Sequence, residues 1–349
     1  MPDIKIAENA GFCFGVRRAT GMLEDALRNK STDEKVYTLG HIIHNEVYLR
    51  DVASRGAECL TYGELDRVLK EVENGSEITV VIRAHGELKE VVERLENAAR
   101  KYPNFTLLNG TCPYVEKVRR IAGENSGDGK IFMLIGAAEH PEVQGIMSCA
   151  DGEKLTFKNS LELETFVNSE NAVKIGKKSI TLAAQTTQKL SEWKKSLEII
   201  KKVYTNPLIF DTICSVTEKR QTEARALASE SDIMLVIGSE ESSNSRKLFE
   251  VTREVCPAVY FVNSVDELPN IKIPHGAKLS ITAGASTPDS VIQEVFRKMN
   301  EQMNENFAEM LEASMKTLNP GDVVEGIVTA VSAGEIQLDL GYKTTGVIS

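Results

Sequence analysis

Three of the six cysteines are spaced almost evenly along the 349-residue chain, at Cys13, Cys112 and Cys214. Each follows an apolar, strand-like run and opens a helix-like run, as in NFTLLNGTC before PYVEKVRRIAG. A helix N-terminus favours the thiolate, which is the form of cysteine that binds a metal. A single buried thiol is usually a packing residue, but three in matching positions favour metal ligation.

The number of these cysteines bears on the kind of metal centre. A structural zinc site takes four ligands, commonly from paired CxxC motifs, and the sequence contains no CxxC. An iron-sulfur cluster accepts single cysteines from distant loops, and three cysteines on a four-iron cluster would leave one iron open to a substrate. Cys59, Cys149 and Cys256 lack the strand-to-helix setting, and we expect them to be packing residues.

Polar side chains follow other predicted strands at similar positions. They are His44, His85, His140, Gln185, Thr186 and Thr187. In open parallel sheets, ligands bind beyond the carboxyl ends of the strands, so these groups are predicted to face one cavity. The alternative for a single histidine is a hydrogen-bonded core residue, and we assign a structural role to His41 and His275.

Two further strand ends carry hydroxyl and amide groups where helices are predicted to begin. They are Ser242, Ser243 and Asn244 after IMLVIG, and Ser286 and Thr287 after LSITAGA. Helix N-termini bind phosphate, although the same residue types are common helix caps. Because neither a GxxxxGK[ST] nor a GxGxxG motif occurs, the pattern favours a small phosphorylated substrate over a nucleotide.

Glu142 follows His140 in HPEVQG, at another predicted helix start. Acidic residues are common in a first helical turn, so its position alone has a structural explanation. Beside a metal centre, the same carboxyl group could donate a proton.

The elements that would position these residues alternate as strand and helix up to about residue 300, which is typical of an α/β protein with parallel sheets. The predicted strands are KVYTL, ITVVIRA, IFMLIG, ITLAA, IMLVIG, AVYFV and LSITA. Division near the cysteines gives three α/β units of about 100 residues each within residues 1–287. They cover about 14–111, 112–198, and 199–287 together with 1–13. We expect a pseudo-threefold arrangement around the metal centre.

Composition excludes several function classes. The 41 Lys and Arg against 51 Asp and Glu give a net charge of −10, which argues against general binding to nucleic-acid phosphates. No apolar run reaches the length of a membrane span and the first residues do not resemble a signal peptide, so we expect a cytoplasmic protein without membrane association. Six cysteines are too few for a disulfide scaffold in a chain of this length.

The sequence changes character after residue 287. Residues 288–318 are predicted to form a helix and linker, and residues 319–349 carry glycine-bounded, β-branched strands. The pattern GDVVEGIVTAV, IQLDLG and GVIS resembles the OB-type RNA-binding repeat of the largest ribosomal small-subunit protein. A complete barrel has further strands, so we expect a truncated repeat. With four acidic residues and one lysine, this fragment is expected to bind RNA poorly, and RNA or the ribosome would need complete repeats.

Nine motifs in residues 1 to about 300 together resemble the 4-hydroxy-3-methylbut-2-enyl diphosphate reductase family. In order, they are GFCFGV, IIHNEV, RAHG, TCP, HPEVQG, QTT, DTIC, SSNS and TAGAS. The resemblance implies three α/β domains around a 4Fe-4S cluster with one open iron. Its ligands would be Cys13, Cys112 and Cys214.

The same resemblance assigns roles to the polar residues. The diphosphate would be held by His44, His85, Ser242, Ser243, Asn244 and Ser286. The allylic alcohol would be surrounded by His140, Thr186 and Glu142, with Glu142 supplying protons.

The implied reaction is a reductive dehydroxylation to isopentenyl and dimethylallyl diphosphate, the final step of the methylerythritol phosphate (non-mevalonate) route to isoprenoids. A ferredoxin or flavodoxin would supply the electrons. From the sequence, two alternatives stay open: a non-redox iron-sulfur hydro-lyase, and an RNA-binding protein that acts through the C-terminal barrel.

Overall fold

The computed structural model describes residues 4–175, 178–268, 273–274 and 276–314, and then residues 323, 325, 327–331, 335–339 and 345–348. This part of the chain contains three four-stranded parallel sheets and one three-stranded antiparallel sheet. The predicted α/β fold with parallel sheets is therefore confirmed. His275 lies outside the described residues. Within those residues, no helix combines the length and the hydropathy needed to cross a membrane.

The first sheet is built by residues 35–109. Its strands are β2 (Lys35–Leu39), β3 (Ala57–Leu60), β4 (Ile78–Ile82) and β5 (Phe105–Asn109), in the spatial order β3-β2-β4-β5. Its helices are α1 (Phe14–Asn29), α2 (Glu46–Ser54), α3 (Leu65–Glu73) and α4 (Lys89–Lys101), with a 3-10 turn at Tyr62–Glu64. Val81 packs with residues of α1 and α2, and Val80 with residues of α3 and α4. Since both faces are covered, β4 is buried at every position.

The second sheet is built by residues 130–209. Its strands are β6 (Lys130–Ile135), β7 (Glu153–Phe157), β8 (Ser179–Ala184) and β9 (Leu208–Ile209), in the order β7-β6-β8-β9. Its helices are α5 (Pro113–Glu124), α6 (Pro141–Met147), α7 (Ser160–Val167), α8 (Glu170–Ile175) and α9 (Leu190–Val203). Leu134 packs with α5 and α6, whereas Met133 packs with α7, α8 and α9. This sheet is therefore also enclosed between two helical layers.

The third sheet joins the start of the chain to its later part. Its strands are β1 (Ile4–Ile6), β10 (Ile233–Ile237), β11 (Ala258–Val262) and β12 (Leu279–Ala283), in the order β1-β12-β10-β11. Its helices are α10 (Ser215–Ser229), α11 (Ser243–Arg253) and α12 (Asp289–Ser314), with a 3-10 turn at Val265–Glu267. Val236 packs with α10 and α11, and Leu235 with α12. Cys256 is buried in the first of these layers, as expected.

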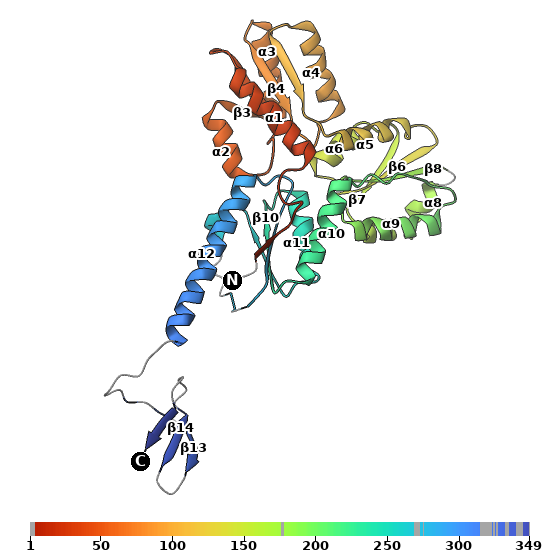
Figure 1. The fold of residues 1–349 in the computed structure, drawn as a ribbon. Helices are drawn as coiled ribbons and strands as arrows, with labels where there is room; N and C mark the ends of the chain where they lie inside the picture. Colours follow the sequence, from red (N-terminus) through yellow and green to blue (C-terminus); the bar gives the residue numbers. More distant parts are fainter. Residues whose placement is uncertain are drawn as a thin grey trace.

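The three sheets share one strand order. In each, the first strand of the unit lies between the second and the third, as β2 lies between β3 and β4. The fourth position is taken by β5, by β9 and, in the third sheet, by β1 from the start of the chain. Figure 1 shows the three units meeting, with the N-terminal strand in the unit of β10. The strand ends of the three units are therefore topologically equivalent.

The C-terminal elements differ from the rest. The strands β13 (Ile327–Val331), β14 (Ile336–Asp339) and β15 (Thr345–Ile348) pair antiparallel in chain order. The register of β13 against β14 shifts between Val328 and Ala330. α12 precedes this sheet; its first part packs on the third sheet, and the helix then extends away from the three units (Figure 1).

Cys59 corrects one expectation from the sequence. It was predicted to be a packing residue, but its side chain is exposed. It lies on β3, an edge strand whose first and last residues alone are buried. Cys149 is half-buried against the core of the second unit, in agreement with a packing role.

Candidate active site

The three repeated cysteines cap three helices. Cys13, Cys112 and Cys214 directly precede α1, α5 and α10, which confirms the predicted strand-to-helix setting. The sulfurs of Cys13 and Cys214 accept hydrogen bonds from backbone N–H groups of the first helical turn, at 3.5 Å and 3.3 Å. A Cβ at Gly15 would lie 2.6 Å from Cys112 Sγ. Glycine at this position therefore lets the first turn of α1 approach the cysteine of the next unit.

The thiols of Cys112 and Cys214 are less acidic than their positions at helix N-termini predict. Burial raises the pKa of Cys112 and of Cys214, and the nearby Cys13 sulfur acts in the same direction. Backbone N–H groups at the helix starts lower both pKa values but are outweighed. The helix N-terminus is thus insufficient to hold these two cysteines as thiolates. A bound metal would supply the positive charge that the helix does not.

The other predicted site residues follow the equivalent strands of the three units. After the first strand come His44, His140 with Glu142, and Ser242 to Asn244. After the third strand come His85, Thr186 and Ser286. The strand order reverses between these two neighbouring strands, and such a switch point is where open parallel sheets bind ligands. The repeated topology therefore places polar groups from each unit at its own switch point.

One cavity collects groups from all three units. Its lining includes Cys13, Cys112, Cys214, His85, His140, Glu142, Thr186, Ser242, Ser243, Asn244 and Ser286. Apolar side chains such as Val16, Ile42 and Ile43 form other parts of the wall. Of the site residues that the resemblance assigns, His44 is the one outside this lining, and Gln185 and Thr287, which the strand-end pattern also singled out, lie outside it as well. The His44 ring lies beside that of His85, with the ring centroids 5.7 Å apart.

The three histidines form a row. The ring centroids of His85 and His140 are 5.3 Å apart. The pKa values of all three histidines are lowered, mainly by burial. The pKa of His44 is below its usual value, that of His85 is well below it, and that of His140 is about 3. These imidazoles are therefore neutral at pH 7. A bound anion would favour their protonated forms and reverse the shift.

Glu142 is the most enclosed acidic group of the cavity. It is 1% exposed, and burial raises its pKa. Its Oε1 accepts a hydrogen bond from the Thr186 backbone N–H at 2.7 Å. His140 caps the same short helix, because its Nδ1 accepts from the Glu142 N–H at 3.2 Å. The second unit thus fixes a carboxyl group that tends to keep its proton.

Several polar atoms at the cavity have no partner among the described residues. They are His85 Nδ1, Asn244 Nδ2 and, in Arg220, Nε and Nη1. A buried donor without an acceptor costs free energy, so such groups are expected to bind a ligand. Around them, Ser286 donates to Ser242 at 3.2 Å, and Thr187 and Ser243 lie 3.3 Å apart. These contacts position the hydroxyl groups near the start of α11.

Two cations at or near the cavity were not identified from the sequence. Arg220 lines the cavity, and Lys247 interacts electrostatically with Glu142. Burial lowers the pKa of Lys247 to about 8. The sequence could have indicated Arg220, because this residue lies in the second turn of the helix that Cys214 caps. Lys247 follows the SSNS motif on α11, but nothing in the local pattern separates it from a surface lysine.

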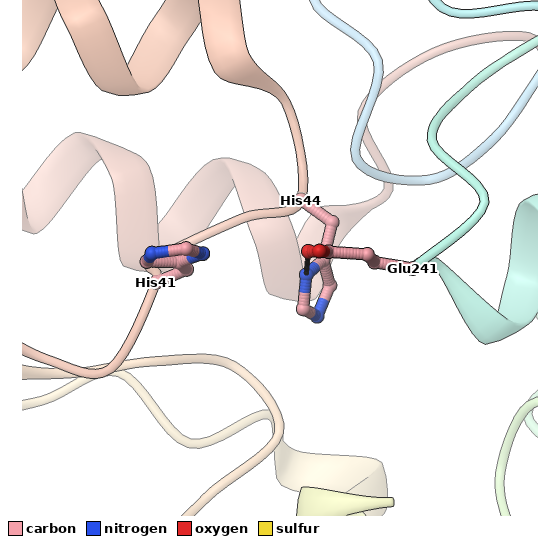
Figure 2. Close-up of side chains that lie close together, drawn as sticks. All are labelled: His41, His44 and Glu241. Carbon is pink, nitrogen blue, oxygen red and sulfur yellow. Dashed lines mark hydrogen bonds and ion pairs between the residues drawn. The ribbon is translucent and has the colours of Figure 1, made fainter. Parts of the chain in front are cut away.

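A second polar group involves His44. Figure 2 shows the His44 ring directed at Glu241, with His41 beside it. The His44 Nδ1 and Glu241 Oε2 atoms are 3.2 Å apart, and the two histidine ring centroids are 6.5 Å apart. The three potential ligand atoms all lie within 4.8 Å of one another. His41, which we had assigned a structural role, is exposed.

The fold and the cavity define an α/β protein of three like units whose cysteines and strand-end polar groups meet in one ligand site. The LytB protein family profile matches residues 4–300. The chain belongs to this family.

Individual relatives carry the same enzyme name. A 4-hydroxy-3-methylbut-2-enyl diphosphate reductase of Caldanaerobacter subterraneus subsp. tengcongensis is 35% identical over 87% of this chain and 99% of its own length. A solved structure of (E)-4-hydroxy-3-methyl-but-2-enyl diphosphate reductase, the terminal enzyme of the non-mevalonate pathway, has 32% identity and a TM-score of 0.58. It covers 86% of this chain and 100% of its own.

A Clostridium acetobutylicum relative of the same name is 35% identical over 100% of this chain. The chain spans about half of that relative's length, with 52% covered. The match therefore extends through the C-terminal strands, whereas the shorter relative aligns with 87% of the chain.

Proposed function

We propose that this chain catalyses the reductive dehydroxylation of 4-hydroxy-3-methylbut-2-enyl diphosphate to isopentenyl and dimethylallyl diphosphate. The observation that carries the proposal is the convergence of three kinds of group in one cavity. These are three thiols, a carboxyl group with a raised pKa, and unpaired donors beside a helix start. The reductases named above are 35% and 32% identical to this chain and support the same reaction.

A 4Fe-4S cluster fits the residues of the cavity. Cys13, Cys112 and Cys214 all line it. Within the described residues, the three sulfurs are not all within 4.8 Å of one another, so they are too far apart to share a single ion and leave room for a larger centre. The unpaired nitrogens of the Arg220 guanidinium lie at the same cavity and suit an anionic sulfur-rich centre. When bound, the cluster supplies electrons and an iron without a protein ligand.

The diphosphate is held at the start of α11 and by two histidines of the row, His44 and His85. Asn244 Nδ2 is a buried donor without a partner in the described chain, and Ser242 and Ser243 carry hydroxyl groups next to it. The free N–H groups of a helix N-terminus stabilise negative charge in the same place. His44 and His85 become protonated when the anion binds, because its charge offsets the cost of burying theirs.

Proton delivery is assigned to Glu142. Loss of the hydroxyl group as water and formation of a new C–H bond consume two electrons and two protons. Glu142 is protonated more readily than an exposed carboxyl group, and the Thr186 N–H fixes its orientation. His140 and Thr186 lie beside it and hold the allylic alcohol within reach. Burial excludes bulk water from the site of protonation.

The test is turnover under anaerobic conditions. Protein with a reconstituted cluster is incubated with the hydroxylated diphosphate and a strong artificial reductant, and the products are separated by chromatography. We expect both five-carbon diphosphates, in amounts that follow the reductant consumed. Turnover that needs no reductant would indicate the hydro-lyase instead.

Two finer assignments belong to the same proposal. A ferredoxin or flavodoxin is the electron donor, as the family resemblance implies. The strands β13 to β15 belong to an OB-type repeat, supported by their antiparallel order and by the register shift in β13. RNA binding through this region alone is expected to be weak, and a filter-binding titration of the purified protein with single-stranded RNA would measure it.

A further inference from the structure

Arg220 is a buried cation, and only part of its guanidinium group is hydrogen-bonded within the described chain. It is 2% exposed, and its Nη2 donates to the Gly11 carbonyl oxygen at 2.7 Å. Its Nε and Nη1 atoms are buried and have no partner among the described residues. A guanidinium is permanently charged and has five N–H donors, so two unpaired nitrogens are costly unless a ligand accepts from them.

The surroundings of Arg220 indicate the kind of ligand. Arg220 and the three cysteines line the same cavity, and its charge interacts with the Cys13 and Cys214 sulfurs. The nearby Glu223 carboxylate already accepts from backbone N–H groups at 2.6 Å and 3.0 Å. Gly11 lies in the loop that leads to Cys13, so the 2.7 Å hydrogen bond ties that loop to the helix of Cys214.

We propose that Arg220 is a positioning residue that sets the reduction potential of the metal centre by donating to its sulfur ligands. This inference rests on the proposed function, because it requires the cluster. Reduction adds negative charge to the centre, and a fixed cation in a site of low dielectric stabilises the reduced form more than the oxidised form. Arg220 therefore makes the centre easier to reduce.

The test is a redox titration of the cluster-loaded protein, followed by electron paramagnetic resonance. For Arg220→Gln we expect at least a tenfold loss in the equilibrium constant for reduction, which corresponds to about 59 mV for one electron. Arg220→Lys, which keeps the charge, should retain most of the wild-type potential. Arg225→Gln is the matched control, because Arg225 lies on the same helix but pairs with Glu254 at 2.6 Å.

Two outcomes would overturn the assignment. One is an unchanged potential in Arg220→Gln with normal iron content. The other needs no variant: pulsed resonance spectra of wild-type protein labelled with ¹⁵N-arginine should show nitrogen coupled to the reduced cluster, and its absence would contradict the hydrogen bond. Failure of wild-type protein to bind iron would instead contradict the proposed function.

A second inference concerns His41, His44 and Glu241 (Figure 2), which we call the rim group. Two imidazoles and one carboxylate form the ligand set of many zinc sites that leave one position open. The three ligand atoms lie within 4.8 Å of one another. Tetrahedral ligands about 2.1 Å from a zinc ion are about 3.4 Å apart, so side-chain movements of about an ångström would complete the site.

The backbone of the rim group is held by packing. Ile42 and Ile43, between the two histidines, are each 1% exposed and belong to the core beneath α1 and α2. Glu241 directly precedes Ser242, the residue that caps α11. The two segments come from different units, and the contact between His44 and Glu241 joins them. Exposure of His41 and Glu241 leaves their side chains free to adjust.

We infer that the rim group binds a divalent transition-metal ion of the zinc class. Because the ion would take His44, which is also assigned to the diphosphate, it would inhibit turnover. The binding itself does not depend on the proposed function and is measured without substrate.

Zinc X-ray absorption and calorimetry test this site on cluster-loaded protein in a Cys59→Ser background, which removes the exposed thiol. We expect one zinc ion with nitrogen and oxygen ligands, and at least a tenfold weaker binding in His41→Ala and in Glu241→Gln. Sulfur ligation, or equal affinity in His41→Ala, would overturn the inference. With free zinc held by a metal buffer, His41→Ala should resist an inhibition that the parent protein shows.

Discussion

The three parallel sheets and the C-terminal sheet use apolar residues in opposite ways. Every residue of β4, β10 and β12 is buried, because helices cover both faces of their sheets. In β13, the residues Ile327 and Val331 are 76% and 72% exposed. Polar groups can be kept away from water at a strand end only where the surrounding sheet is enclosed. We therefore expect the proposed reaction to take place within the three units and not at the C-terminal strands.

The largest effect is expected from loss of a thiol at the centre of the three units. Cys112→Ser should abolish cluster binding and turnover, because a serine hydroxyl group is a poor ligand for iron in such a centre. Iron content and the visible absorption spectrum measure this. Cys59→Ser is the control, since Cys59 is exposed on an edge strand. A full iron content in Cys112→Ser would remove Cys112 from the ligand set.

Glu142→Gln is expected to act on the rate alone. The amide oxygen can still accept from the Thr186 N–H, so the local structure is retained, but the proton is lost. Loss of a general acid corresponds to a decrease in kcat of about 10²- to 10⁴-fold, with KM little changed. Steady-state kinetics under anaerobic conditions separate the two constants. An unchanged kcat would exclude Glu142 from proton delivery.

Asn244→Ala is expected to act on binding. It removes a buried donor that has no partner within the described chain. A hydrogen bond to a charged group contributes about 1.5–3 kcal/mol, so KM should rise about 10- to 100-fold. Asn168→Ala, at the C-terminal cap of α7, is a control outside the cavity lining. If both variants had the same KM, the diphosphate assignment at α11 would fail.

The pH dependence of stability should report the buried histidines. Burial lowers the pKa of His140 to about 3, so the unfolded chain binds its proton first. Stability from this group is present above the unfolded pKa of about 6.5 and is lost as pH falls from there toward 3. Denaturant unfolding of cluster-free protein should therefore show a free energy of unfolding that decreases as the pH is lowered from 7.5 to 5.

His140→Asn is the matched variant for that measurement. Asparagine is a good N-cap and can replace the acceptor of the Glu142 N–H, but it does not titrate. Its stability should fall less steeply with pH than that of the parent protein. An identical slope would mean that His140 is not the group responsible.

The smallest effect is expected at the C-terminus. Deletion of all residues after Ser314 should leave iron content and kcat unchanged, because the family profile ends at residue 300 and, among the residues that the structure describes, the cavity lining ends at Ser286. A loss of iron or of turnover in the shortened protein would contradict the contrast between the two regions.

Much of the site was predictable because its residues carry local signals. The strand-to-helix setting of Cys13, Cys112 and Cys214 follows from apolar runs next to amphipathic ones, and the structure has all three helices. Residues after strand ends, such as His85 and His140, are predictable for the same reason. The parallel sheets follow from the alternation of strands and helices.

What the sequence could not supply depends on distant contacts. Arg220 is significant because of Gly11 and the thiols around it, and the hydrogen bond to Gly11 spans 209 positions. The thiol pKa values of Cys112 and Cys214 follow burial, which outweighs the local effect of a helix start. Cys59 was assigned to the interior because periodicity does not reveal which strand lies at an edge.

The placement of β1 has a consequence for how the protein is made. Ile4 pairs with Leu279, so the strand that leads to Cys13 has no neighbour in its sheet until residues near 279 have left the ribosome. During synthesis, the first two units can form before this closure. The loop that carries Cys13 and the third unit that carries Cys214 therefore reach their final arrangement only after this closure. If the proposed metal centre needs all three thiols in place, its insertion should follow synthesis of the residues near 279.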